Sequence, residues 1–274
     1  MVGPSRPKFV LFGSSIVQMG YNVGGWSAVL ADLYARKADV LLRGYSGWNS
    51  RMALQALDRI FPKDAAVQPS LVVVYFGGND ATNPHPSGLG GHVSLPEYVD
   101  NMKKIIVHLK SLSDKTRIIC LGSPPVNEAK VRKDLMTKPG QMKPAAYSEA
   151  LVELCKELDV EAINLWTAFQ QRDDWANACL VDGIHLSAEG SKVVVAEILK
   201  VLKKANWEPS LYWLSMPSEF PEDSPYYIVD PDEHSFYGSQ YYTIFRFIPV
   251  PDALFFLEIE ILFSNEVRSA HFKD

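Results

Sequence analysis

Features that would mark several classes of protein are scarce in this sequence. The chain has 274 residues and a formal net charge of −5, so it has no excess of basic side chains to neutralise a nucleic-acid backbone. Its three cysteines, Cys120, Cys155 and Cys179, form no CxxC pair, which argues against a zinc site and favours reduced, buried thiols in a cytosolic protein. We therefore expect neither a metal site nor a nucleic-acid partner.

Long hydrophobic runs are also missing. The late apolar stretch at residues 253–263 is short of the roughly 18 to 20 residues that a membrane-spanning helix needs, and it contains Glu258 and Glu260. The apolar run before Gly13 is too short for a secretory signal peptide. We expect a cytoplasmic protein without a membrane span. The sequence contains no GxSxG or GxxxxGK[ST] motif, which argues against an α/β-hydrolase lipase and a P-loop nucleotide site.

Short apolar runs alternate with longer segments of helical period along the chain. The expected strands are residues 8–12, 39–43, 71–76, 117–122 and 161–165. The expected helices are residues 26–36, 50–60, 95–112, 144–158 and 188–204. Ser94 with Glu97 fits a capping box, and Ser187 precedes the last helix in the same way. The alternation predicts an α/β fold with three layers, α/β/α, around a five-stranded parallel sheet.

Four polar motifs lie at the ends of these expected elements. In a parallel sheet the ligand site lies beyond the carboxyl ends of the strands. There the chain carries FGSSI (12–16), GYSGWN (44–49) and GGND (77–80), while DGIH (182–185) precedes the last helix. The spacing within DGIH lets Asp182 hold one imidazole nitrogen of His185 while the other nitrogen faces outward. Alone, DGIH and GGND are each typical of ordinary turns.

Together the four motifs resemble the four sequence blocks of the SGNH (GDSL) hydrolase superfamily, over roughly residues 8–205. The segments FGSSIVQ, RGYSGWNSR, VVYFGGNDA and DGIHLS are most similar to plant-type GDSL esterases related to isoamyl acetate-hydrolysing esterase. The resemblance implies a flavodoxin-like SGNH hydrolase fold. It further implies a serine esterase that cleaves short-chain, acetyl-type esters, with a small-molecule ester and water as substrates and no cofactor.

The resemblance assigns a role to each motif. Serine esterases need a nucleophile, a base, a group that orients the base, and donors for the oxyanion. By position in the blocks, Ser15 is the nucleophile, His185 the general base and Asp182 its orienter. The backbone N–H groups of Ser15 and Gly47 and the side-chain amide of Asn79 are the oxyanion donors.

The residues around Ser15 carry further expectations. The superfamily's first block usually has aspartate before the nucleophile, where this chain has Ser14. The plant-type branch tolerates serine at that position, so Ser15 remains the nucleophile. Gly13 is expected to let the backbone turn sharply off the strand, and the dipole of the following helix is expected to favour negative charge near Ser15.

Two other functions remain open at this point. The same machinery could remove acetyl groups from sugars as a carbohydrate O-acetyl esterase, or the fold could serve as a non-catalytic module that binds acyl groups or sugars. For an esterase, residues 81–93 and 124–142 are long enough to wall the acyl pocket, with Leu89, Val126 and Met136 as contacts. The residues leave the oligomeric state open.

The composition changes after Asn206, where proline, acidic and aromatic residues replace helical periodicity. We therefore divide the chain into a hydrolase domain (1–205), an extension that resembles that of the plant-type relatives (206–230) and a divergent tail (231–274). An edge strand and a partner-binding segment are alternatives for this tail, and we favour a poorly packed appendage.

Overall fold

The structure of the protein is a computed structural model that describes residues 3–85, 87, 90–131, 142–221 and 224–226. The chain divides into two compact units, Met1–Glu219 and Phe220–Asp274. In the second unit, the rings of Phe220 and Tyr226 meet edge to face with their centroids 5.3 Å apart. The predicted tail, residues 231–274, lies outside the described residues, so its packing remains a prediction.

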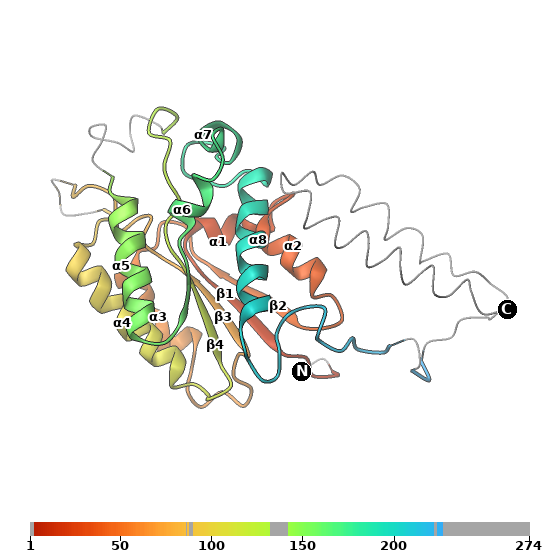
Figure 1. Cartoon of the computed structure of the whole chain (residues 1–274). Coiled ribbons are helices and arrows are strands. Elements are labelled where there is room, and N and C mark those ends of the chain that lie inside the picture. The colour runs from red at the N-terminus through yellow and green to blue at the C-terminus, as the bar shows by residue number, and fades with distance from the viewer. Residues whose placement is uncertain (1–2, 86, 88–89, 132–141, 222–223, 227–274) are drawn as a thin grey trace. The chain divides into compact units, whose positions relative to one another are not determined.

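A parallel sheet forms the centre of the first unit (Figure 1). Its strands are β1 (Lys8–Gly13), β2 (Asp39–Gly44), β3 (Leu71–Tyr75), β4 (Arg117–Leu121) and β5 (Glu161–Ile163). They form a 5-stranded sheet in the order β2-β1-β3-β4-β5, and each neighbouring pair is parallel. All five residues of β3 are buried, as expected for a central strand that is covered on both faces.

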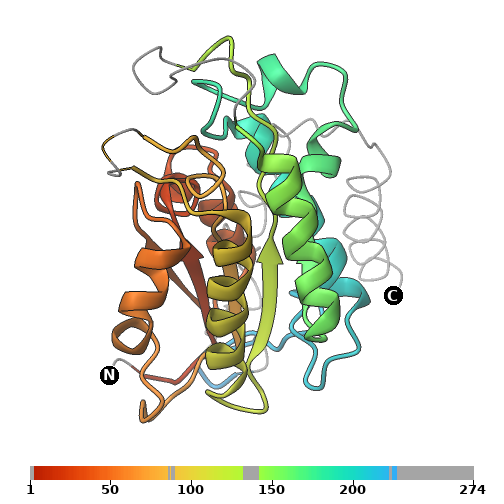
Figure 2. The same ribbon diagram turned by 90° about the vertical axis from the view of Figure 1, so that its left-hand side faces the viewer.

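Helices cover both faces of this sheet. The helices are α1 (Ser15–Gln18), α2 (Trp26–Leu33), α3 (Ser50–Ile60), α4 (Leu95–Lys110), α5 (Pro144–Glu157), α6 (Leu165–Phe169), α7 (Trp175–Ala178) and α8 (Ala188–Lys204), with a 3₁₀ turn, η1 (Met19–Tyr21), after α1. Helices α3, α4 and α5 lie on one face, and α2 and α8 lie on the other (Figures 1 and 2). The predicted three-layer α/β/α fold is therefore confirmed.

The alternation of side chains along the strands supplies both layers of the core. Phe12 of β1 and Val72 and Val74 of β3 belong to the buried cluster beneath α3, α4 and α5. Leu11, one position from Phe12, is equally buried, and its side chain points to the opposite face because successive strand residues alternate. Burying both faces in this way fixes the register of each strand and hence the position of the loop that follows it.

The end of α2 and the cap of α4 differ from the sequence-based expectation. Helix α2 ends at Leu33 rather than Arg36, and Arg36 itself has a φ of +63°, a left-handed conformation that a helix does not continue through. Ser94 precedes α4 but makes no capping hydrogen bond with its side chain. The predicted capping box is wrong because Glu97 accepts two hydrogen bonds from Arg51 of α3, and such charge-assisted pairs are stronger than a bond to a neutral N–H.

The segment after α8 packs back on the first unit. The Tyr34 hydroxyl donates to the backbone oxygen of Leu211 at 2.7 Å, and the Lys37 ammonium donates to that of Met216 at 2.7 Å. Leu211 and Met216 are buried. Residues 206–219 are therefore held at the end of α2 and belong to the same compact unit as the sheet.

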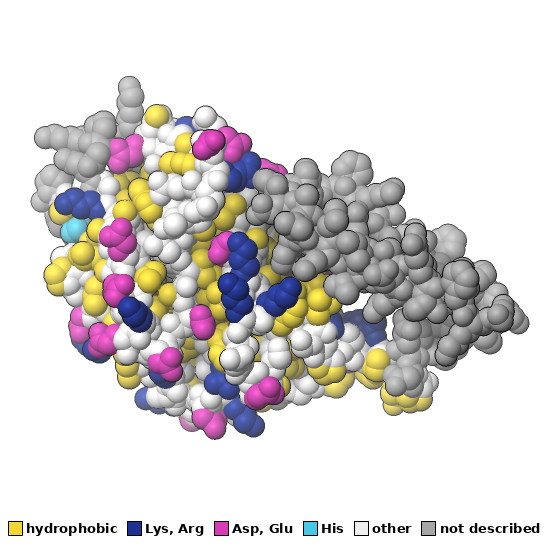
Figure 3. Space-filling model, in the orientation of Figure 1, with side chains coloured by type: hydrophobic (Ala, Val, Ile, Leu, Met, Phe, Trp, Pro, Cys, Tyr) yellow, Lys and Arg dark blue, Asp and Glu magenta, His cyan; other side chains and the backbone are white. Residues whose placement is uncertain are grey.

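The surface of the described residues carries charges of both signs. Figure 3 shows Lys and Arg side chains interspersed with Asp and Glu over one face, with apolar side chains between them. All three cysteines are buried and free. Within the described parts of the chain, no helix is both long enough and apolar enough to cross a bilayer.

Candidate active site

Ser15 lies directly beyond the carboxyl end of β1, as the first residue of α1. Gly13 is the last residue of β1 rather than a turn residue, and it pairs with Gly44 and Tyr75 on the two neighbouring strands. A Cβ atom at Gly13 would lie 2.5 Å from the backbone oxygen of Tyr75, so glycine is required there for close packing of the strands. The expected sharp turn at Gly13 is therefore corrected to a close approach. Helix α1 spans 4 residues, too few for the expected helix dipole to act at Ser15.

Ser15, His185 and Asp182 form one hydrogen-bonded chain. The Oγ atom of Ser15 is 3.0 Å from Nε2 of His185, and Nδ1 of His185 is 2.6 Å from Oδ2 of Asp182. Ser15 is 8% exposed, so its hydroxyl is nearly buried but still reachable from the rim of the sheet. One ring nitrogen of His185 thus faces a hydroxyl and the other faces a carboxylate, an arrangement that can pass a proton from Ser15 to the imidazole.

The carboxylate of Asp182 is held in its ionised form. Burial acts to raise the pKa of Asp182, but hydrogen bonds from the backbone N–H groups of His185 and Ile184 and from the His185 ring outweigh it and lower the pKa to about 2. The two backbone bonds are 2.8 and 3.0 Å long and both reach Oδ1. Oδ2 is therefore left to accept from the imidazole, which fixes the orientation of the ring.

The loop that carries Asp182 and His185 is anchored at both ends. Leu180 and Leu186 form an antiparallel bridge across its base. Gly183, at its tip, has a φ of +93°, and its backbone oxygen accepts a hydrogen bond from Asn127 N–H at 2.9 Å. A Cβ atom at Gly183 would lie 2.4 Å from the backbone oxygen of Asn127, so glycine is needed for both the turn and the contact. Ser187 then caps α8 by accepting from Gly190 N–H, as predicted.

Gly47 and Asn79 lie in the two loops that flank Ser15. Gly47 follows β2 with a φ of +81°, and the space around the position of a Cβ atom is open to 4 Å. Asn79 follows β3 and donates from Nδ2 to the backbone oxygen of Trp48 at 2.7 Å. One amide hydrogen of Asn79 is thus committed to the neighbouring loop, and the second remains to donate elsewhere.

Two polar side chains that the sequence-based reasoning missed hold the loop of Gly47. Gln18 of α1 accepts from Ser46 N–H at 2.8 Å, which ties the loop to the helix that begins with Ser15. Asn49 caps α3 by accepting from Met52 N–H at 3.0 Å. Asn49 directly before a helical segment is an N-cap signal that could have been recognised from the sequence.

A small cavity of about 150 Å³ lies beside His185. Apolar side chains of α1, η1 and the loop before α8 contribute to its wall, including Ile16, Met19, Val181 and Leu186. None of these four residues was among the three predicted ester contacts, of which Val126 is half-buried. The remaining two, Leu89 and Met136, lie outside the described residues.

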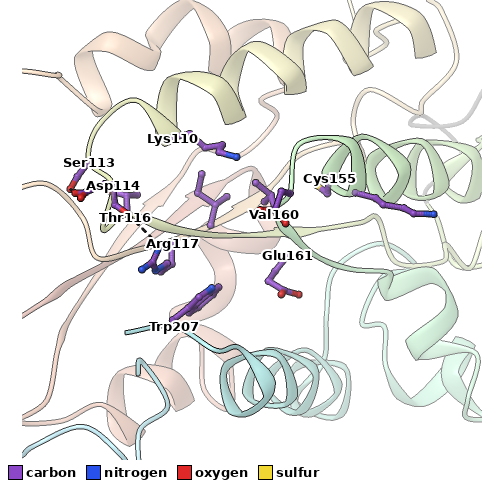
Figure 4. Close-up of a pocket in the computed structure, with 12 residues that line it drawn as sticks. Lys110, Ser113, Asp114, Thr116, Arg117, Cys155, Val160, Glu161 and Trp207 are labelled. Atoms are coloured by element: carbon purple, nitrogen blue, oxygen red, sulfur yellow. Dashed lines mark hydrogen bonds between the residues drawn. The ribbon is translucent and has the colours of Figure 1, made fainter. Parts of the chain in front are cut away.

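A larger cavity of about 530 Å³ lies at the other end of the sheet, near the amino ends of β4 and β5 (Figure 4). Lys110 lies across this cavity from Arg117 and Trp207, and acidic and basic side chains both line it. Neither Ser15 nor His185 is among the residues that line it. The larger cavity is therefore separate from the candidate active site.

Comparisons with known proteins identify the family of this chain. The GDSL-like Lipase/Acylhydrolase family model matches residues 11–193. The chain is 59% identical over 250 residues to GDSL esterase/lipase CPRD49 of Arabidopsis thaliana, and the match covers 89% of this chain and 98% of that relative. It is 34% identical over 230 residues to isoamyl acetate-hydrolyzing esterase 1 homolog of Rattus norvegicus, covering 79% of this chain and 90% of that relative.

Solved structures show the same fold at low sequence identity. A catalytic mutant of Axe2, an acetylxylan esterase from Geobacillus stearothermophilus, has a TM-score of 0.57 at 20% identity, covering 73% of this chain and 95% of that chain. The acetyl xylan esterase AlAXEase has a TM-score of 0.58 at 16% identity, covering 71% of this chain and 98% of that chain. Both support the assignment of the SGNH hydrolase fold.

Proposed function

The chain belongs to the GDSL-like Lipase/Acylhydrolase family and is a carboxylic ester hydrolase, and from this premise we propose that it cleaves short-chain esters with a triad of Ser15, His185 and Asp182. The observation that carries the proposal is the continuous hydrogen-bonded chain from Ser15 Oγ through the imidazole to the Asp182 carboxylate. A serine hydroxyl is a weak nucleophile unless a base takes its proton, and His185 is in place to do so.

In the first half of the reaction, Ser15 Oγ attacks the ester carbonyl while its proton moves to Nε2 of His185. Asp182 stabilises the resulting imidazolium and keeps the ring in the orientation that the reaction needs. The negative charge on the carbonyl oxygen is stabilised by the N–H groups of Ser15 and Gly47 and by the amide of Asn79. His185 then gives its proton to the leaving alkoxide, and an acyl group remains on Ser15.

In the second half, water takes the place of the alcohol. His185 removes a proton from this water as it attacks the acyl carbonyl, and the same three donors stabilise the oxyanion. When the tetrahedral intermediate collapses, Ser15 recovers its proton from His185 and the carboxylic acid leaves. The reaction needs only side chains and backbone groups of this chain, together with an ester and water.

The cavity beside His185 supports compact, uncharged substrates. The leaving alcohol takes its proton from His185, so a cavity on the His185 side is placed to hold the alcohol portion of the ester. A volume of about 150 Å³ fits a group of a few carbon atoms, and the wall combines apolar side chains such as Ile16 and Leu186 with polar ones such as Asn22 and Ser187. The small volume favours the alcohol of a simple ester over an acetylated sugar, which is larger than such a group.

Hydrolysis of p-nitrophenyl acetate, butyrate and palmitate tests the proposal. The purified full chain is expected to cleave acetate and butyrate, with kcat/KM for palmitate at least about tenfold lower, because a palmitoyl chain is too large for the cavity of about 150 Å³ that the described residues form beside His185. Equal or faster cleavage of palmitate would contradict the short-chain assignment. A folded protein without activity on any of the three esters would contradict the proposed function as a whole.

A further inference from the structure

Asp80, the residue after Asn79, is a carboxylate with no solvent exposure. Its Oδ1 atom accepts a hydrogen bond from Ser50 N–H at 2.9 Å, and its Oδ2 atom accepts one from Gly77 N–H at 3.1 Å. Burial raises the pKa of the Asp80 carboxyl, and the hydrogen bonds from Ser50 and Gly77 offset part of that effect. A buried group of this kind is costly to keep, and the reaction described above gives it no chemical step.

The two partners of Asp80 belong to different loops of the candidate active site. Gly77 follows β3 and leads into the turn that carries Asn79. Ser50 is the first residue of α3, and it ends the turn that carries Gly47. Asp80 therefore bridges, through one carboxylate, the two loops in which the proposed oxyanion donors stand.

Neighbouring contacts reinforce this bridge. Asn79 donates to the backbone oxygen of Trp48 at 2.7 Å, and Asn49 donates to that of Gly91 at 3.0 Å. Together with the bond from Ser50 to Asp80, three hydrogen bonds therefore join the two loops. Asn101 of α4 donates to the Ser50 hydroxyl at 3.1 Å. The negative charge also lies at the amino end of the 11-residue helix α3, where unpaired N–H groups favour an anion.

We propose that Asp80 is a positioning residue that sets the spacing between the oxyanion donors Gly47 and Asn79. The inference rests on the proposed function of those two donors. Because Asp80 is fully buried, it acts through the loops and does not touch the substrate. Donors in an oxyanion hole stabilise the transition state only when they are held close to where the charge develops, so a small displacement lowers the rate more than it weakens substrate binding.

Asp80→Asn tests the bridge with almost no change of volume. A carboxylate accepts at both oxygens, whereas an amide presents an NH₂ group to one of the two N–H donors, from Ser50 or Gly77, and repels it. We expect kcat for p-nitrophenyl acetate to fall about 10- to 100-fold while KM changes less than about threefold. The inhibition constant of an alkyl boronic acid, whose tetrahedral serine adduct places an oxygen in the oxyanion hole, should rise by about the same factor as kcat falls.

Ser148→Ala is the matched control. Ser148 is also fully buried and its hydroxyl donates to Asn164 at 3.0 Å, but Ser148 belongs to α5 and Asn164 caps α6, so this bond joins neither of the two loops. This variant should lose stability in thermal unfolding while kcat and the boronic acid constant stay within about twofold of wild type. A role of Asp80 in stability alone would instead make Asp80→Asn behave like Ser148→Ala.

Each outcome decides between the inferences. If wild type cleaves the ester and Asp80→Asn keeps kcat and the boronic acid constant within twofold, the positioning role of Asp80 is wrong and the proposed function stands. If the wild type cleaves none of the esters, both proposals fail. If Asp80→Asn does not fold, Ser50→Ala decides by the same comparison, because it removes the hydrogen bond that the Ser50 hydroxyl donates to the Asp80 carboxylate. A matched loss in kcat and inhibitor binding supports the role, and unchanged values overturn it.

Discussion

Nε2 of His185 lies 3.0 Å from Oγ of Ser15, although 170 positions separate the two residues in the chain. The contact exists because β1 is a central strand of the sheet, with Ser15 at its carboxyl end, while the loop before α8 returns to the same rim. Both ends of the domain must therefore be folded before the hydrogen bond can form.

Ser15→Ala should abolish ester hydrolysis, whereas Ser14→Ala should not. Loss of the nucleophile is expected to lower kcat by about 10³-fold or more. Ser14 contributes mainly its backbone oxygen, which accepts from Val17 and Gln18 N–H at 3.1 and 2.9 Å, and alanine keeps these bonds. Initial rates with p-nitrophenyl acetate measure both variants. If Ser14→Ala is the inactive one, the nucleophile has been assigned to the wrong serine.

The layers of the fold could be predicted because the inner strands β1, β3 and β4 are buried on both faces. Strands such as β3 then read as continuous apolar runs, and the helices between them show their own period, so both could be placed to within a few residues. The motifs at the strand ends identified the candidate site for the same reason, since parallel strands end at one rim.

Contacts between loops could not be predicted in the same way. The pairing of Glu97 with Arg51 replaced the expected cap because α3 and α4 lie side by side, which no local pattern indicates. The bridge made by Asp80 depends on how close the loops after β2 and β3 approach each other. The need for glycine at Gly13 likewise arises from a neighbouring strand rather than from a turn. Tertiary contact decided each of these cases.

Asp182→Asn should lower kcat by about 10² to 10⁴-fold, because an amide cannot stabilise the imidazolium of His185. It should also change how stability depends on pH. The pKa of Asp182 is about 2 in the folded protein, below its ordinary value of 3.8, so the ionised carboxylate contributes stability above pH 3.8 that is lost as pH falls through 2. The contribution is small, because the Asp182 side chain is 50% exposed and solvent screens it.

Urea unfolding of wild type and Asp182→Asn between pH 2 and about pH 6 measures this effect. The difference in the free energy of unfolding between the two proteins should be constant above about pH 4 and shrink toward pH 2. A difference that grows as the pH falls would contradict the lowered pKa.

Asn79→Ala should lower kcat by about 10²- to 10³-fold, the usual effect of removing one oxyanion donor. Gln68→Ala is its control, because the Gln68 amide also donates to backbone oxygens, those of Pro62 and Lys63 at 3.0 Å, but outside the four motifs. Steady-state kinetics with p-nitrophenyl acetate compare the two, and Gln68→Ala should retain wild-type kcat. Equal effects of both substitutions would remove Asn79 from the oxyanion hole.

Ile105→Ala should destabilise the protein far more than Val107→Ala, although both residues are on α4. Ile105 is fully buried beneath the sheet, and its truncation is expected to lower the free energy of unfolding by about 2 to 5 kcal/mol. Val107 is 51% exposed, so the same kind of truncation should change that free energy by less than about 0.5 kcal/mol. Chemical denaturation gives both values, and similar losses would mean that α4 packs on the sheet through a different face.

Val181→Asp should change which alcohol the enzyme accepts more than how fast it works. Val181 lines the cavity beside His185, where the alcohol portion of the ester is proposed to lie. An aspartate there also alters the electrostatics around His185, but that effect acts on all esters of one acid equally. The ratio of kcat/KM for butyl acetate to that for methyl acetate isolates the cavity, because the two esters differ only in the alcohol. We expect a ratio of about tenfold or more in wild type, falling to about two- to threefold in Val181→Asp.

Val107→Asp on α4 introduces the same charge at an exposed valine outside the cavity and should leave the ratio unchanged. A ratio near one in the wild type would show that the alcohol does not enter this cavity. A high ratio that survives Val181→Asp would place the alcohol against another part of the rim.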